Sequence, residues 1–179
     1  MIDTTLINRT YSTTSLLTTK KPDILPNLED QFETLLFLPK GENRKGEGGL
    51  RTKGYFKKPY EDKPLISIIT VVYNGEKYLE ETIQSVINQT YDNVEYIIID
   101  GGSTDGTVDI IKKYEDQIDY WVSEKDTGMY NALNKGFSCA QGDYLGWLNA
   151  DDTLFPNAFK DINTVFKSFP DVQIGRAHV

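Results

Sequence analysis

A nearly continuous apolar run occupies residues 65–72 and reads Leu65-Ile-Ser-Ile-Ile-Thr-Val-Val72. Its β-branched residues predict a strand that is buried on both faces, as in a parallel sheet. Apolar residues then recur from Leu79 to Ile87 at the spacing of an amphipathic helix. Three similar units follow, with strands expected at 94–99, 118–122 and 144–148 and helices expected around 108–114, 129–140 and 156–169. Four strand–helix units in a row predict an α/β fold with a mainly parallel sheet and flanking helices.

The last of these helices has a pronounced apolar pattern. Pro156 is expected to open it, because proline is favoured at the first helical position. Its apolar residues are expected to face inward and comprise Phe159, Ile162, Val165, Phe166 and Phe169.

Composition and charge limit the classes of protein to consider. The chain has 179 residues with 19 Lys and Arg against 27 Asp and Glu, a formal net charge of −8. This acidic balance argues against nucleic-acid binding, which needs a basic surface. A single cysteine, Cys139, excludes a disulfide framework within the chain. No apolar run reaches the roughly 20 residues of a membrane helix, and the polar N-terminus lacks a signal-peptide core, so we expect a cytoplasmic protein.

The composition changes near residue 64. Residues 1–63 are rich in Ser, Thr and Pro, and they include the Gly-rich and charged segment 41–54, which predicts a flexible loop. We therefore expect residues 1–63 to be a poorly structured extension or the tail of a preceding domain, and residues 64–173 to form the folded domain. Residues 174–179 continue no pattern, and we expect them to be a non-native tail.

Side chains able to bind a ligand follow each expected strand. Ligands of parallel α/β sheets bind beyond the carboxyl ends of the strands. These ends carry Tyr73-Asn-Gly75, Asp100-Gly-Gly102, Glu124-Lys-Asp126 and Asn149-Ala-Asp-Asp152. Three of the four bear carboxylates. Each has an alternative structural interpretation, because Asp126 and Asp152 can cap the helices that follow, and residues 100–106 can be a tight turn with a Ser or Thr cap.

Two adjacent carboxylates, Asp151 and Asp152, repel each other unless a cation lies nearby. Mn²⁺ or Mg²⁺ is the natural partner, because these ions take oxygen ligands and bind through one or two carboxylates plus substrate phosphates. A dinucleotide-binding turn is disfavoured, since G-x-G-x-x-G would need glycine where Ser103 stands, and no G-x-x-x-x-G-K-[ST] loop occurs.

A series of longer motifs spans about residues 64–172. It comprises Ile66-Ser-Ile-Ile-Thr-Val-Val-Tyr-Asn-Gly75, Ser85-Val-Ile-Asn-Gln-Thr90, Tyr96-Ile-Ile-Ile-Asp-Gly-Gly-Ser-Thr-Asp-Gly-Thr107, Asp126-Thr-Gly-Met-Tyr-Asn-Ala-Leu-Asn-Lys-Gly136 and Gly142-Asp-Tyr-Leu-Gly-Trp-Leu-Asn-Ala-Asp-Asp152. In this order the motifs resemble glycosyltransferase family 2. The resemblance implies the GT-A fold, a Rossmann-like fold of nucleotide-diphospho-sugar transferases, incomplete at the C-terminus of this chain.

The resemblance also implies a site for a nucleotide-diphospho-sugar donor. In this family the loop after the first strand, here Val71 to Tyr73, holds the base. The Asp that ends the second strand, here Asp100, contacts the nucleotide, and Asp126 would lie near the donor.

The D-x-D element of the family corresponds to the turn after the fourth strand. Asp152 is expected to bind the divalent metal, and Asp151 is expected to contact the donor and to share the metal. Asn149 stands where the first Asp of the element usually lies, so that position keeps an oxygen but loses a charge.

The reaction implied is the metal-dependent, inverting transfer of a sugar from a UDP-sugar to a saccharide or lipid-linked acceptor. The family context implies surface polysaccharide biosynthesis and peripheral association with the cytoplasmic face of the inner membrane. The catalytic base of the family lies downstream of the D-x-D element, so we name no candidate in this chain and expect weak transfer or none. A nucleotidyltransferase of related fold and a non-catalytic nucleotide-sugar-binding fragment remain alternatives.

Overall fold

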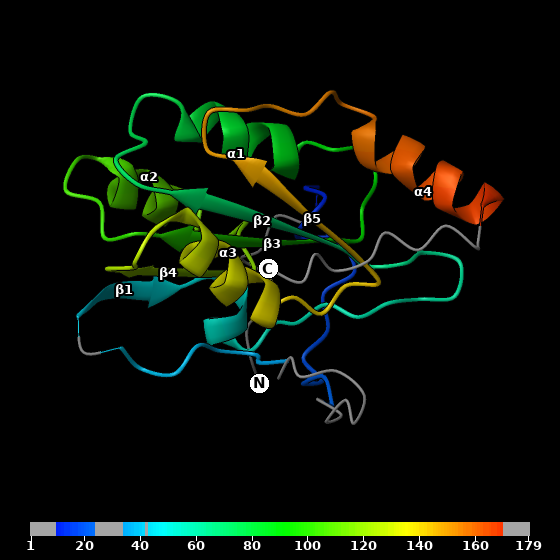
Figure 1. Ribbon diagram of the computed structural model, residues 1–179. Coiled ribbons are helices and arrows are strands. Elements are labelled where there is room, and N and C mark those ends of the chain that lie inside the picture. The colour runs from blue at the N-terminus through cyan, green and yellow to red at the C-terminus, as the bar shows by residue number, and fades with distance from the viewer. Residues whose placement is uncertain (1–9, 24–33, 42, 170–179) are drawn as a thin grey trace.

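The computed structural model describes residues 10–23, 34–41 and 43–169. Within them, a five-stranded sheet has the order β1-β4-β3-β2-β5 (Figure 1). The strands are β1 (Arg44–Gly48), β2 (Ile66–Val72), β3 (Val94–Asp100), β4 (Tyr120–Glu124) and β5 (Tyr144–Asn149). Strands β2 to β5 are parallel to one another, and β1 runs antiparallel to β4. The predicted α/β fold with a mainly parallel sheet is confirmed.

Helices cover both faces of this sheet. They are α1 (Leu79–Ile87), α2 (Thr107–Lys113), α3 (Met129–Ser138) and α4 (Ala158–Ser168), with a short 3₁₀ helix η1 (Leu50–Lys53). α1 and α2 lie on one face and α3 on the other (Figure 1). Along β3, Ile98 packs in the core that α1 and α2 share, whereas Ile97 and Ile99 pack in the core on the α3 side. Because side chains alternate across a strand, a strand between two helical layers is apolar on both faces along most of its length.

β4 begins two residues later than the sequence pattern predicts. The carbonyl of Ile118 accepts a hydrogen bond of 2.9 Å from Leu50 N–H, and that of Asp119 accepts one of 2.9 Å from Arg51 N–H. These two residues therefore bind the backbone of η1 before the strand starts.

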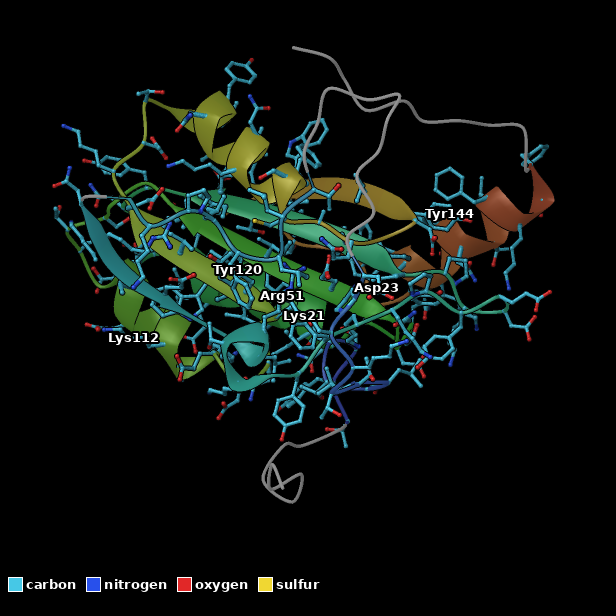
Figure 2. All side chains as sticks on the ribbon, turned by 90° about the horizontal axis from the view of Figure 1, so that it is seen from below. Lys21, Asp23, Arg51, Lys112, Tyr120 and Tyr144 are labelled. Carbon is cyan, nitrogen blue, oxygen red and sulfur yellow. The ribbon has the colours of Figure 1, made fainter. Side chains whose placement is uncertain are left out.

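The segment before residue 64 contributes to the folded domain. β1 pairs with β4, and Leu50 in η1 is fully buried. Arg51 is buried as well, with its guanidinium carbon 5.8 Å from the centre of the Tyr120 ring, and the two side chains lie together in Figure 2. The expectation of a flexible loop at 41–54 is wrong, because backbone pairing with β4 orders a segment that has no apolar alternation of its own. The expected tail at 174–179 lies outside the described residues.

α4 is less buried than its apolar pattern predicts. Phe159 is buried, but Val165 and Phe169 are 53% and 59% exposed. The helix lies beyond β5, which is an edge strand (Figure 1). There the ring of Phe166 stacks on Tyr144 with centroids 4.4 Å apart, and Figure 2 places Tyr144 beside this helix. The expectation that all five apolar residues face inward is therefore wrong, since a helix at the sheet edge meets the described core along only part of its surface.

No helix among the residues that the structure describes combines the length and the apolar character needed to cross a bilayer.

Candidate functional site

A cleft of about 940 Å³ lies at the carboxyl ends of the parallel strands. The loops that follow β2, β3, β4 and β5 all contribute to its lining, as expected for ligand sites of parallel sheets. Of the residues predicted from the sequence, the lining contains Val71, Tyr73, Asp126 and Asp151. The tertiary structure thus brings together four of the six predicted site residues, one from the end of β2 and three from different loops.

Asp100 does not line the cleft, because its carboxylate is enclosed by protein donors. The residue is fully buried. Its carboxylate accepts hydrogen bonds of 3.1 Å from the backbone N–H groups of Gly102 and Ser103 and of 2.6 Å from the Ser123 hydroxyl. The Ser103 hydroxyl donates to it as well. In this structure Asp100 holds the turn after β3, and its contact with a nucleotide stays a prediction.

The loops after β2 and β3 are tied to each other across the cleft rim. Asn74 N–H donates to the Ser103 hydroxyl at 2.7 Å, and the Asn74 side-chain oxygen accepts from Thr104 N–H at 2.9 Å. Asn74 has φ of 52°, a left-handed conformation that asparagine tolerates better than most residues. This connection fixes the loop that presents Tyr73, whose side chain is 66% exposed.

Asp126 approaches the same turn from the loop after β4. A Cβ atom added at Gly101 would lie 2.8 Å from the Asp126 carboxylate, so glycine at this position lets Asp126 keep its present place against the turn. Gly102 has φ of 85°, which favours glycine as well. The carboxylate of Asp126 also accepts a 2.8 Å hydrogen bond from Gly128 N–H at the start of α3. Asp126 therefore combines a local structural role with a place in the cleft.

Asp151 and Asp152 take different positions in the turn after β5. Asp151 lines the cleft and is exposed. Asp152 lies outside the lining, and its carboxylate accepts a 2.9 Å hydrogen bond from the side-chain amide of Asn149. The interpretation of Asp152 as a helix cap is wrong, because α4 begins only after Asn157 and its cap has no side-chain hydrogen bond. The turn is held instead by the Thr82 hydroxyl, which donates to the Asp152 carbonyl at 2.9 Å.

The carboxylate oxygens of this turn suit a divalent cation whose remaining ligands come from a substrate. Within the described ranges, no group of three or more His, Cys, Asp or Glu side chains is close enough together to enclose a metal ion. Mg²⁺-type sites in enzymes, however, often use one or two carboxylates plus phosphate oxygens. The exposed carboxylates of Asp151 and Asp152 fit that arrangement chemically.

Several lining residues were not predicted from the sequence, and two of them come from the segment before residue 64. These are Lys45 in β1 and Asn43 just before that strand. The Lys45 ammonium donates hydrogen bonds to the carbonyls of Gly102 at 2.7 Å and Ser103 at 3.0 Å. No local pattern in residues 41–54 could have revealed this, because it depends on the pairing of β1 with β4.

Glu124, at the end of β4, is engaged by two cations. Its carboxylate accepts hydrogen bonds from Arg44 at 2.9 Å and from Lys135 at 2.7 Å. Burial alone would raise the pKa of the Glu124 carboxyl, but the hydrogen bonds from Lys135 and Arg44 hold it below its ordinary value. Glu124 is therefore a structural carboxylate that ties β1 and α3 to β4.

The fold defines an α/β protein with a cleft at the carboxyl ends of its parallel strands. The sequence model of glycosyl transferase family 2 matches residues 67–178. The chain belongs to this family, which confirms the resemblance that its motifs indicate.

Relatives and solved structures agree with this assignment. The putative teichuronic acid biosynthesis glycosyltransferase TuaG of Bacillus subtilis is 43% identical over 93 residues, 50% of this chain and 37% of TuaG. TarS 1–349 of S. aureus, in complex with UDP-GlcNAc, superposes with a TM-score of 0.54 at 25% identity over 58% of this chain and 31% of that chain. The mannosyltransferase PcManGT of Pyrobaculum calidifontis, in complex with GDP-Man and Mn²⁺, gives a TM-score of 0.51 at 27% identity over 57% and 32%.

These similarities establish the GT-A fold. The chain spans less than two fifths of the length of these curated relatives.

Proposed function

We propose that this chain forms the donor-binding part of a glycosyltransferase that uses a nucleotide-diphospho-sugar, and specifically a UDP-sugar. The observation that carries the proposal is the cleft at the strand ends, where the carboxylates of Asp126 and Asp151 face the same space as Tyr73. The complexes of TarS with UDP-GlcNAc and of PcManGT with GDP-Man support a nucleotide-sugar ligand for a cleft in this fold.

The charge of the domain explains why a metal belongs to this proposal. Residues 64–179 hold 8 basic and 18 acidic residues, so scattered lysines cannot balance a diphosphate. Asp151 and Asp152 would hold Mn²⁺ or Mg²⁺ together with the diphosphate oxygens, and the Mn²⁺ complex of PcManGT supports this. When bound, the cation supplies Lewis-acid stabilisation of the negative charge that develops on the leaving diphosphate.

The proposed reaction is an inverting transfer to a saccharide or lipid-linked acceptor. The acceptor hydroxyl attacks the anomeric carbon on the side opposite the diphosphate, and a carboxylate base takes its proton. The similarity to TuaG, which is named for teichuronic acid biosynthesis, supports a role in surface polysaccharide synthesis. We propose that the protein acts in the cytoplasm, at the periphery of the inner membrane.

Nucleotide binding measured by isothermal titration calorimetry tests this proposal. We expect UDP to bind the 179-residue chain in the presence of Mn²⁺, and the affinity to fall at least about tenfold when EDTA replaces the metal. Asp151→Asn and Asp152→Asn should each lower the Mn²⁺-dependent affinity, because each removes one anionic ligand. Asp161→Asn, an exposed position in the first turn of α4, is the matched control and should bind UDP as the wild type does.

The alternatives give different results in the same experiment. A preference for UTP over UDP would support a nucleotidyltransferase. Tight UDP binding that is unchanged by EDTA and by Asp151→Asn would support a metal-independent binding module. Absence of UDP and GDP binding by the wild type would contradict a donor site at this cleft.

A further inference from the structure

Lys45 is presented to the cleft by an irregularity in β1. Arg44 pairs with Glu124 and Gly46 pairs with Ser123, so β1 has one more residue than β4 at this point, and that residue is Lys45. Such a β-bulge lies next to many active sites, where it redirects a side chain. Here the bulge lies in an edge strand that precedes the region matched by the family model, which starts at residue 67.

The Lys45 ammonium lies on the cleft rim, and two hydrogen bonds to the protein leave one of its N–H donors unused. Its Nζ atom donates to the carbonyls of Gly102 at 2.7 Å and Ser103 at 3.0 Å. An ammonium has three N–H donors and no acceptor, so these two contacts leave one donor for a ligand. Lys45 and Lys125 are the cationic residues among the described lining of the cleft.

The order of the strands indicates which part of the ligand lies near this donor. The carbonyls that Lys45 contacts follow β3, whereas Asp151 follows β5, and β2 lies between these two strands. Neighbouring strands are about 4.8 Å apart, so the two ends of the site are separated by about 10 Å. A donor whose diphosphate lies at Asp151 would therefore place its base, on the far side of the ribose, at the end where Lys45 lies.

We propose that Lys45 donates a hydrogen bond to the carbonyl oxygen at C4 of uracil and makes this cleft select uracil over cytosine. This inference rests on the proposed nucleotide-sugar function. Uracil has a carbonyl oxygen at C4 where cytosine has an amino group, and the donor-only ammonium of lysine matches the carbonyl alone. The same rule applies to guanine and adenine at C6.

Calorimetric titration of matched nucleotide pairs with the full chain in Mn²⁺ tests this role. UDP and CDP form one pair, and GDP and ADP form the other. We expect the wild type to bind UDP at least about tenfold more tightly than CDP. Lys45→Met should lower the UDP affinity about tenfold and leave the CDP affinity within about twofold. Lys20→Met, an exposed lysine of the N-terminal segment, is the control and should change neither.

The CDP measurement separates base recognition from a purely structural role. If Lys45 only held the Gly102–Ser103 turn or attracted phosphate, Lys45→Met would weaken UDP and CDP equally, and that result would overturn the proposal. Unchanged UDP binding by a variant that retains the thermal midpoint of the wild type would overturn it too. A wild type that binds UDP but does not discriminate against CDP refutes the role of Lys45 alone, whereas a wild type that binds none of the four nucleotides refutes the proposed function.

Discussion

The side-chain amide of Asn149 donates a 2.9 Å hydrogen bond to the carboxylate of Asp152, three residues later in the turn after β5. The neutral amide thus stands beside a carboxylate at a position where a second carboxylate would repel it. This contact stabilises the turn without a cation. Because Asn149 is neutral, the turn carries one negative charge fewer than it would with aspartate at this position.

Asn149→Asp should make this turn depend on metal. The substitution removes a hydrogen bond and places two like charges together, which we expect to cost about 1 kcal/mol and to lower the melting temperature by about 2–4 °C in EDTA. A divalent cation relieves the repulsion, so Mn²⁺ should raise the melting temperature of the variant more than that of the wild type. Differential scanning fluorimetry with and without Mn²⁺ measures both effects.

Asn134→Asp provides the matched control for this change. Asn134 is exposed on α3 and is not part of the cleft lining, so the same added charge should have no metal-dependent effect there. Equal Mn²⁺ responses of the two variants would contradict a metal role for the turn after β5.

Glu95→Gln should destabilise the fold strongly, because it leaves a buried cation without its partner. The guanidinium of Arg51 donates to the Glu95 carboxylate at 2.5 Å, and the two side chains are only 2% and 1% exposed. Removing one partner of a buried ion pair typically costs about 3–5 kcal/mol. Equilibrium unfolding in urea, followed by circular dichroism, should show a loss in this range.

The exposed pair of Lys63 and Asp92 serves as the comparison. Its side chains are 42% and 40% exposed, and exposed ion pairs contribute about 1 kcal/mol or less. Asp92→Asn should therefore shift the unfolding free energy only slightly. Arg51 belongs to the segment before residue 64, and Glu95 belongs to β3. If Glu95→Gln lowered the unfolding free energy no more than Asp92→Asn does, this would contradict a role of the buried pair in joining the two segments.

Asp119 should make stability fall as pH rises through the weakly acidic range. Burial raises the pKa of Asp119 to about 7, although Lys57 nearby opposes the shift. An unfolded aspartate has a pKa of about 3.9, so between about pH 4 and pH 7 the folded state binds one proton more than the unfolded state. The stabilisation is therefore complete below about pH 4 and is lost as pH rises through about 7.

Asp119→Asn isolates this contribution. Asparagine can keep the acceptor that binds Tyr96 N–H, a contact of 2.8 Å, but it does not titrate. Urea unfolding of both proteins at pH 4.5, 5.5 and 6.5 should show the stability of the wild type falling relative to that of the variant. The series stays below pH 7 because burial also lowers the pKa of Lys57 to about 8. A difference that does not change with pH would contradict the raised pKa.

Ser103→Ala should loosen the cleft rim. The buried hydroxyl accepts from Asn74 N–H and donates to Asp100. Its loss leaves the Asn74 N–H without that acceptor and removes one of several donors to the Asp100 carboxylate. A buried donor left without an acceptor costs about 1–3 kcal/mol, and UDP affinity should fall severalfold because the loop of Tyr73 loses one of the hydrogen bonds that hold it. Calorimetry and thermal melting measure the two effects. Ser168→Ala, which removes an exposed hydrogen bond at the end of α4, should alter neither.

The elements that could be predicted are those whose formation depends on residues close together in the sequence. β2 and β3 were predicted because a strand between two helical layers is mostly apolar on both faces, and that run of apolar residues is visible in the sequence. α4 was predicted as a helix by its spacing, but the exposure of Val165 and Phe169 was not. Periodicity identifies the apolar face of a helix and contains no information about what that face meets.

The candidate site shows the same division. The carboxylates of Asp126 and Asp151 could be predicted because polar residues that end parallel strands meet at one edge of the sheet. Asp100 obeys the same rule, yet it is buried beneath the turn that it holds. Whether a strand-end carboxylate faces ligand or protein depends on which hydrogen-bond donors surround it. Here one of the donors to Asp100, the Ser123 hydroxyl, comes from a different strand.

Residue order alone was enough to identify the alternation of strands and helices, the parallel sheet and the acidic strand ends, because each depends on neighbours a few positions apart. The strand β1, its bulge and the place of Lys45 in the cleft came only from the folded chain. They require pairing between residues such as Arg44 and Glu124, which are 80 positions apart. No short stretch of the sequence contains both partners, so a local pattern cannot indicate that the pairing is favourable.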